Sequence, residues 1–166
     1  MSGEGAHNPY DDTALLANVA TLQVGVDDIH DAIEHVSAIF PDDTDLTCTF
    51  TAAAGANTWS GWAEIVDSAA TTLSSLFVAT PGHLSSLTIE EISDTSALYM
   101  IEVAYGGARI VTVRARVAGS GKFHSPDTHA KFWAPLIPAG ETIYYRMKTD
   151  KAVADTCNIH FRYHVH

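Results

Sequence analysis

The hydrophobic positions of the chain follow two different periods, and the change falls near Pro41. Between residues 15 and 36, apolar side chains recur in alternating steps of four and three. This heptad spacing places them along one face of an α-helix. We therefore expect a helix from about Thr13 to Ile39, ended by Pro41. The seven positions of its apolar seam are Leu15, Val19, Leu22, Val26, Ile29, Ile33 and Val36.

A seam this narrow is typical of helices that associate with copies of themselves. β-Branched residues occupy the a positions, and Leu, Ile and Val share the d positions. Because Ile at d favours three or more strands over two, we predict a homotrimeric coiled coil. The alternative is that the stripe packs on the chain's own domain, as most amphipathic helices do. The missing charged e and g pairs, and Gly25 within the helix, leave this alternative open.

After Pro41 the period changes to two, which is typical of β-strands with one face in water. Turn-rich segments such as TPGH, YGGAR and IPAGE separate the alternating stretches. The pattern predicts about eight short strands and no second helix. The expected strands are Leu46–Thr51, Trp62–Val66, Leu73–Ala79, Leu84–Ile92, Tyr99–Tyr105, Val111–Val117, Ile143–Lys148 and a closing strand that contains Ile159–Val165.

Eight antiparallel strands predict a mainly β fold, a two-sheet sandwich of the jelly-roll type, with an immunoglobulin-like sandwich as the alternative. In a jelly roll the first and last strands are neighbours. Both carry an inward cysteine here, so Cys48 and Cys157 should lie close together, as reduced thiols. The expected organisation is an N-terminal arm at residues 1–12, a trimerisation helix at 13–40 and the sandwich at 41–166.

The charge balance excludes one class of partner. Asp and Glu outnumber Lys and Arg by 20 to 9, and the formal net charge is −11. Nucleic-acid binding depends on clustered cations, and the chain has no run of Lys or Arg, so we expect no nucleic-acid partner. The N-terminus lacks the pattern of a secretory signal, and no stretch approaches the ~20 apolar residues of a membrane span. We expect a cytosolic product with no membrane partner.

The closing stretch HFRYHVH, residues 160–166, carries three histidines. Every second residue of this strand is apolar, so the histidines share the opposite face with Arg162. His164 and His166 would lie about 6.6 Å apart along the strand, close enough to hold one metal ion. Because Arg162 is a repelling cation beside them, we interpret this face as solvated or as an interface. We predict no cofactor, with a metal at His164 and His166 as the alternative.

The sequence offers no pattern for catalysis. Cupins, the jelly-roll enzymes, hold a metal with HxH followed by Glu and a later His. The only HxH here is His164 to His166, with nothing after it. GxGxxG, Walker A and GxSxG motifs are missing from the sequence, and AGSGK is too short for a P-loop. We therefore expect a protein that is not an enzyme.

Three tryptophans raise the question of carbohydrate binding, because jelly rolls often bind sugars through exposed aromatic side chains. Trp59 and Trp62 lie in NTWSGW, and Trp133 lies in KFWAPLI. They could form a platform for a glycan. Large aromatic side chains more often fill a core, and this is the interpretation that we prefer for Trp62 and Trp133.

Several stretches resemble the strand-and-turn segments of trimeric jelly-roll decoration (cement) proteins and head-fibre proteins of tailed bacteriophages. They are WSGWAEIVDS, LSSLTIEEISDTSALYMIEVAYGG and PLIPAGETIYYRMK. The resemblance implies a homotrimer on the capsid surface of a virion, made in the host cytoplasm and bound to the major capsid protein, which strengthens contacts between capsomers. The alternative is the receptor-binding tip of a tail or head fibre, which would bind a cell-surface glycan.

Overall fold

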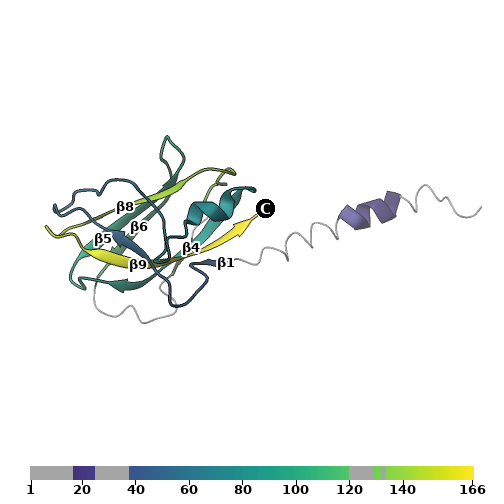
Figure 1. The fold of residues 1–166 in the computed structure, drawn as a ribbon. Helices are drawn as coiled ribbons and strands as arrows, with labels where there is room; N and C mark the ends of the chain where they lie inside the picture. The colour runs from purple at the N-terminus through teal and green to yellow at the C-terminus, as the bar shows by residue number, and fades with distance from the viewer. Residues whose placement is uncertain (1–16, 25–37, 120–128, 132–133) are drawn as a thin grey trace, which may run out of the picture. The chain divides into compact units, whose positions relative to one another are not determined.

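The structure, a computed structural model, describes residues 17–24, 38–119, 129–131 and 134–166 (Figure 1). The chain divides into two compact units, residues 1–36 and 37–166. In the first unit, residues 17–24 form a helical segment. The second unit consists of two antiparallel sheets and one short 3-10 helix. Figure 1 shows β8, β5 and β6 in one layer and β9 and β4 in the other.

The strands fall into two sheets. The first contains β1 (Ala38–Phe40), β2 (Cys48–Thr51), β4 (Gly82–Ile92), β7 (His129–Lys131) and β9 (Thr156–Val165). Its order is β1-β9-β4-β7, and β2 also pairs with β9. The second contains β3 (Ala63–Glu64), β5 (Leu98–Tyr105), β6 (Ile110–Ala118) and β8 (Ile143–Thr149), in the order β3-β8-β5-β6.

Strand β9 organises the first sheet. It pairs with β4 along one edge, and with β1 and then β2 along the other. Cys157, Ile159 and Phe161 are fully buried, which confirms the alternation expected for this strand. Val165 was expected to face the core, but its side chain is 43% exposed. The expected inward pattern therefore holds along most of β9 and fails at its last residue, Val165.

One core joins the two sheets. Inward residues of β5 and β8, such as Ile101 and Met147, pack with inward residues of β2, β4 and β9. The rings of Phe50 on β2 and Tyr145 on β8 are stacked, with centroids 3.7 Å apart and planes 5° apart. In these strands, every second residue is apolar because every second side chain points into this core.

Residues 73–77 differ from the expected strand at Leu73–Ala79. They form a 3-10 helix, η1 (Leu73–Phe77), so the expectation of no second helix is also wrong. Thr72 caps it, because its hydroxyl oxygen accepts a hydrogen bond from the Ser75 amide at 3.2 Å. Leu73 and Phe77 are both buried. Both side chains pack into the common core from this turn.

The expected helix end also differs from the structure. Ala38–Phe40 forms strand β1, in which Phe40 lies opposite Phe161 of β9, so a helix that reaches Ile39 is wrong. Phe40 is 4% exposed and Ile39 is 40% exposed. Pairing with β9 directs the side chain of Phe40 into the core.

The two cysteines lie on neighbouring strands, as expected. Cys48 of β2 is opposite Ile159 of β9, and Cys157 is opposite Phe50, so the cysteines are diagonal neighbours. Both are buried free thiols. Burial, with a smaller contribution from nearby Asp67 or Asp155, raises the pKa of each thiol to about 12. They remain protonated, and act as small core residues.

Candidate functional site

The outer face of the second sheet contains a buried carboxylate. Glu102 of β5 lies between Arg114 of β6 and Arg146 of β8 in the strand register. Its side chain is 0% exposed, against 64% for Arg114 and 28% for Arg146. The Arg114 Nε donates to Glu102 Oε1 at 2.6 Å, and the Arg146 Nε donates to Oε2 at 2.6 Å. Each carboxylate oxygen thus has its own guanidinium.

Two tryptophans stack on this ion pair. Residues 57–60 run along β8, with the Asn57 amide donating to the Thr149 carbonyl at 2.6 Å and the Ser60 amide to the Met147 carbonyl at 2.9 Å. The Arg146 Cζ lies 4.6 Å from the ring centroid of Trp59 and 4.5 Å from that of Trp62. Both distances are within the range of cation–π attraction.

The tryptophans therefore do not fill the core. Ala63 pairs with Tyr145, whose neighbour Arg146 faces outward, and Trp62 lies on that outer side. Both Trp59 and Trp62 are partly exposed, so the core interpretation is wrong for Trp62. Trp133 lies outside the described residues. The sheet register, which the sequence does not give, decides which face receives the rings.

The same face gathers most of the chain's few cations. Lys148 Nζ lies 4.8 Å from the Trp59 ring centroid, and Arg109 stacks at 3.4 Å over the ring of Tyr144. We call this surface the aromatic–cationic face. It includes five of the chain's nine Lys and Arg residues, with Glu64 opposite Tyr144 at its edge. Its members are Trp59, Trp62, Arg109, Arg114, Arg116, Tyr144, Arg146 and Lys148.

The aromatic–cationic face has the chemistry of a surface that binds an anionic ring compound. Aromatic faces stack on flat apolar surfaces, and exposed guanidinium groups pair with carboxylate, sulfate or phosphate. Arg146 is already committed to Glu102, so it holds the rings in place. Arg116 on β6 and Lys148 on β8 flank that pair, both beside Met100 in the strand register. They are the cations that a ligand would meet.

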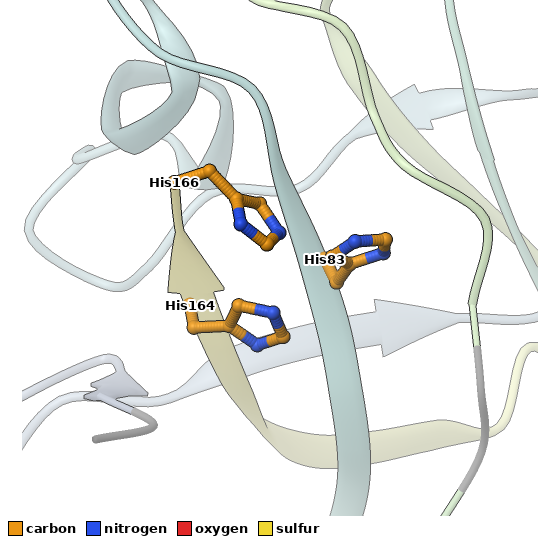
Figure 2. Close-up of side chains that lie close together, drawn as sticks. All are labelled: His83, His164 and His166. Carbon is orange, nitrogen blue, oxygen red and sulfur yellow. The ribbon is translucent and has the colours of Figure 1, made fainter. Parts of the chain in front are cut away.

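A second cluster lies on the outer face of the first sheet, at one end of β9. His164 and His166 share this face, and His83 of β4 joins them (Figure 2). The ring centroids are 5.0 Å apart for His83 and His164, 4.9 Å for His83 and His166, and 5.0 Å for His164 and His166. One ring nitrogen from each lies within 4.8 Å of the other two.

The tautomer of His83 is fixed by its neighbour. Its Nδ1 lies 2.9 Å from the carbonyl oxygen of Ala134. A carbonyl only accepts hydrogen bonds, so Nδ1 carries the proton and Nε2 has the lone pair. His83 and His164 are half-buried, and His166 is exposed.

His83 was not expected as a member of this cluster. The sequence suggested only a turn at TPGH, and His83 lies 81 positions before His164. The sequence does place His83 directly before an expected strand. It does not show that this strand pairs with the closing strand, which is what brings His83 beside His164. His160, on the same strand face, takes no part, because its Nε2 lies 3.0 Å from Glu90 Oε2.

The helical segment carries the described part of the expected trimer seam. Val19 is 53% exposed and Leu22 is 69% exposed. Leu15, Val26, Ile29, Ile33 and Val36 lie outside the described residues. Among the residues that the structure does describe, no helix has the length and apolar character needed to cross a membrane.

Comparison with known proteins adds no relative to this picture. A scan of protein-family models and searches of curated proteins and of solved structures found no match to this chain.

Proposed function

We propose that this chain is a structural protein of a tailed-phage virion, which assembles as a homotrimer and decorates the outer capsid by binding the major capsid protein. The observation that carries the proposal is the exposed seam of the helical segment. Val19 and Leu22, at consecutive a and d positions, are 53% and 69% exposed. Burying a side chain of this kind stabilises an assembly by about 1.5–3 kcal/mol, so a trimer would gain at each seam position of each chain.

The strand order supports a jelly roll as the head of this trimer. From β2 to β5, successive strands alternate between the sheets: β2 and β4 lie in the first, and β3 and β5 in the second. The strands β2 and β9 are neighbours, as the first and last strands of a jelly roll are. An immunoglobulin-like sandwich places its last two strands in one sheet, whereas β8 and β9 lie in different sheets.

The oligomeric state is the first test, and two valines of the same helical segment provide matched variants. Val19 lies on the seam, and Val24, 60% exposed, lies off it at an f position. We expect the wild-type chain and Val24→Asp to be trimers, and Val19→Asp to be a monomer, by light scattering coupled to size-exclusion chromatography. A monomeric wild type, or a trimeric Val19→Asp, would reject the seam as the assembly surface.

Capsid attachment needs its own test. Purified trimer is mixed with capsids assembled from the major capsid protein of the virus that carries this chain, and the mixture is sedimented. Decoration predicts saturable co-sedimentation, and capsids that withstand a higher temperature when decorated. A trimer that stays in the supernatant at all concentrations would reject the decoration role while leaving the helix seam intact.

The aromatic–cationic face favours a second candidate, the receptor-binding tip of a tail or head fibre. Its occupant would be an acidic cell-surface glycan, because Trp59 and Trp62 offer ring faces and Arg116 and Lys148 offer cations. Solvent-exposed aromatic rings beside guanidinium groups are a common way to hold a charged sugar.

Acidic polysaccharides immobilised on a sensor surface test this candidate. Exposed arginines on the two sheets provide the matched pair, since Arg116 belongs to the aromatic–cationic face and Arg162 lies on β9. We expect Arg116→Gln to weaken binding on the order of tenfold, and Arg162→Gln to leave it unchanged. Equal effects, or no binding of the wild-type chain to any acidic glycan, would reject the receptor-binding role.

A further inference from the structure

We propose that His83, His164 and His166 form a binding site for one divalent late first-row transition metal ion, with Zn²⁺ as its representative. The site is built within a single chain. It goes beyond the role in the virion, and does not depend on it.

The donor set suits this class of ion. Imidazole nitrogen is a borderline ligand that binds Zn²⁺, Ni²⁺, Cu²⁺ and Co²⁺ well, and oxygen-preferring ions such as Mg²⁺ and Ca²⁺ poorly. Three histidines hold an ion and leave a fourth position for water, an anion or a group from another molecule. The three rings supply three such nitrogens from two neighbouring strands (Figure 2).

The geometry needs only small side-chain movements. The ligand nitrogens now lie within 4.8 Å of one another. With Zn–N bonds of about 2.0–2.1 Å in tetrahedral geometry, two ligand nitrogens lie roughly 3.4 Å apart. Rotations about the side-chain bonds of His164 and His166 can close a gap of about 1.4 Å. The backbone does not need to move.

His83 is already in the form that a metal ligand requires. Metal-bound histidines usually donate their other ring N–H to a carbonyl or carboxylate, which fixes the tautomer and the ring orientation. The Ala134 carbonyl plays this part, at 2.9 Å from Nδ1 of His83. Ala134 is itself buried, at 2% exposed. Nε2 of His83 is therefore the atom that would bind the ion.

The backbone positions of the three ligands are set by hydrogen bonds. His83 lies opposite His164 in the pairing of β4 with β9. The His166 amide donates to the Pro81 carbonyl at 3.0 Å. Gly82 donates to and accepts from Ile137, at 3.1 and 2.8 Å. The first two contacts hold the ends of β4 and β9 together before any ion arrives, and the third holds β4 to residue 137, which lowers the ordering cost of binding.

The cation beside the cluster does not prevent binding. Arg162 lies on the same face, between His160 and His164 along the strand. His83 and His166 place the ion on the side of His164 that is remote from Arg162. Arg162 is also exposed to solvent. At such separations, salt screens much of the repulsion between exposed charges. His160 cannot compete for the ion, because Glu90 lies 3.0 Å from its Nε2.

Zinc titration of the full chain, stripped with a chelator and followed by calorimetry, tests the site. We expect one Zn²⁺ per chain and a higher unfolding temperature with the ion present. Co²⁺ in place of Zn²⁺ should give the visible absorption bands of a tetrahedral site. His83→Gln and His166→Gln, two separate ligand variants, should each lower the affinity on the order of 100-fold. His160→Gln, on the same strand face, should leave it unchanged.

The controls separate this site from other histidines and from the trimer. The chain has nine histidines, so His83→Gln defines the background of nonspecific binding. A wild-type affinity no tighter than that background, or an equal loss in His160→Gln, would overturn the site. The Val19→Asp chain should bind the ion as the wild type does. Loss of binding in that variant would place the ligands on different chains, and would overturn the single-chain site whatever its function.

Discussion

Glu102 is a carboxylate at a position that strand alternation points outward, and its side chain is nevertheless 0% exposed. Two arginines pair with it, and two tryptophan rings lie against one of them, Arg146. A carboxylate in such surroundings stays ionised only with close partners, because its desolvation costs several kcal/mol. The order of the aromatic–cationic face therefore depends on this one ion-paired residue.

The two arginines that share Glu102 should differ in their contribution to stability. Arg146 is 28% exposed and held by both rings, whereas Arg114 is 64% exposed. We expect Arg146→Gln to lower the free energy of unfolding by about 2–3 kcal/mol, and Arg114→Gln by about 1 kcal/mol or less. Urea unfolding of the two variants measures the difference. Equal losses of unfolding free energy in the two variants would mean that solvent exposure does not determine how much each arginine stabilises the fold.

Single residues were the least predictable part of the molecule from its sequence. On β9, alternation alone placed His164 and His166 on the outer face, but it failed at Val165, which is 43% exposed. The same reasoning could not find His83, because its contact with His164 depends on which distant strand pairs with β9. Nor could it place Trp62, because β3, which follows it, has only two residues and shows no period.

Strands β4 and β9 approach each other most closely where a side chain is missing. A Cβ at Gly82 would overlap the carbonyl oxygen of His164, and would lie 2.6 Å from Cε1 of Phe77. Glycine lets the two strands and the end of η1 meet at this point. The position next to His83 thus sets the distance between the strands that carry the histidine cluster.

Alanine substitutions at two glycines test this packing. We expect Gly82→Ala to lower the free energy of unfolding by about 1–3 kcal/mol, because β4 and β9 must move apart. Gly107→Ala is the matched control, since a Cβ there meets nothing within 4 Å. Gly82→Ala should also weaken Zn²⁺ binding. Thermal unfolding of both variants decides the point, and an unaffected Gly82→Ala would contradict the close approach.

Whole strands were more predictable than single residues when they were long enough for the alternation of apolar and polar residues to repeat. The strands β5, β6, β8 and β9 have enough residues for alternation to show. The stretch LSSLF is five residues long, and its two apolar pairs fit either a helix or a strand, so only the tertiary contacts of Leu73 and Phe77 decide for η1. The heptad pattern likewise could not reveal that β9 recruits residues 38–40 as a strand.

The molecule as a whole has a core that contains ionisable hydroxyl and thiol groups. Burial raises the pKa of Cys48 and Cys157 to about 12, and it also raises the pKa values of Tyr99, Tyr145 and Tyr163. These groups come from both sheets. The folded state therefore keeps five protons that the unfolded chain would release in base.

This arrangement predicts that the protein is sensitive to base. For the thiols, the stabilising contribution is complete below the unfolded pKa of 9.0 and is lost as the pH rises toward about 12. We expect the free energy of unfolding in urea to be lower at about pH 11 than at about pH 8. Cys48→Ala should show a smaller decrease. Equal stability at both pH values would contradict the burial of these groups.

At this scale the sequence predicted the mainly β class and the neighbouring positions of the two cysteines. The pairing of distant strands was predictable only for the first and last, through the assumed fold. The order of the remaining strands depends on packing between sheets, which local alternation does not encode.

The central place of β9 also bears on how the protein is made. Thr49 of β2 and Asn158 of β9 share a hydrogen bond, although they are 109 positions apart in the sequence. At a synthesis rate of roughly 5–20 residues per second, β2 waits about 5–20 s for its neighbour. The helical segment at residues 17–24 leaves the ribosome before β2. In the proposed trimer, nascent copies on one messenger RNA would meet through their helices before any sandwich closes, so assembly would precede folding of the head.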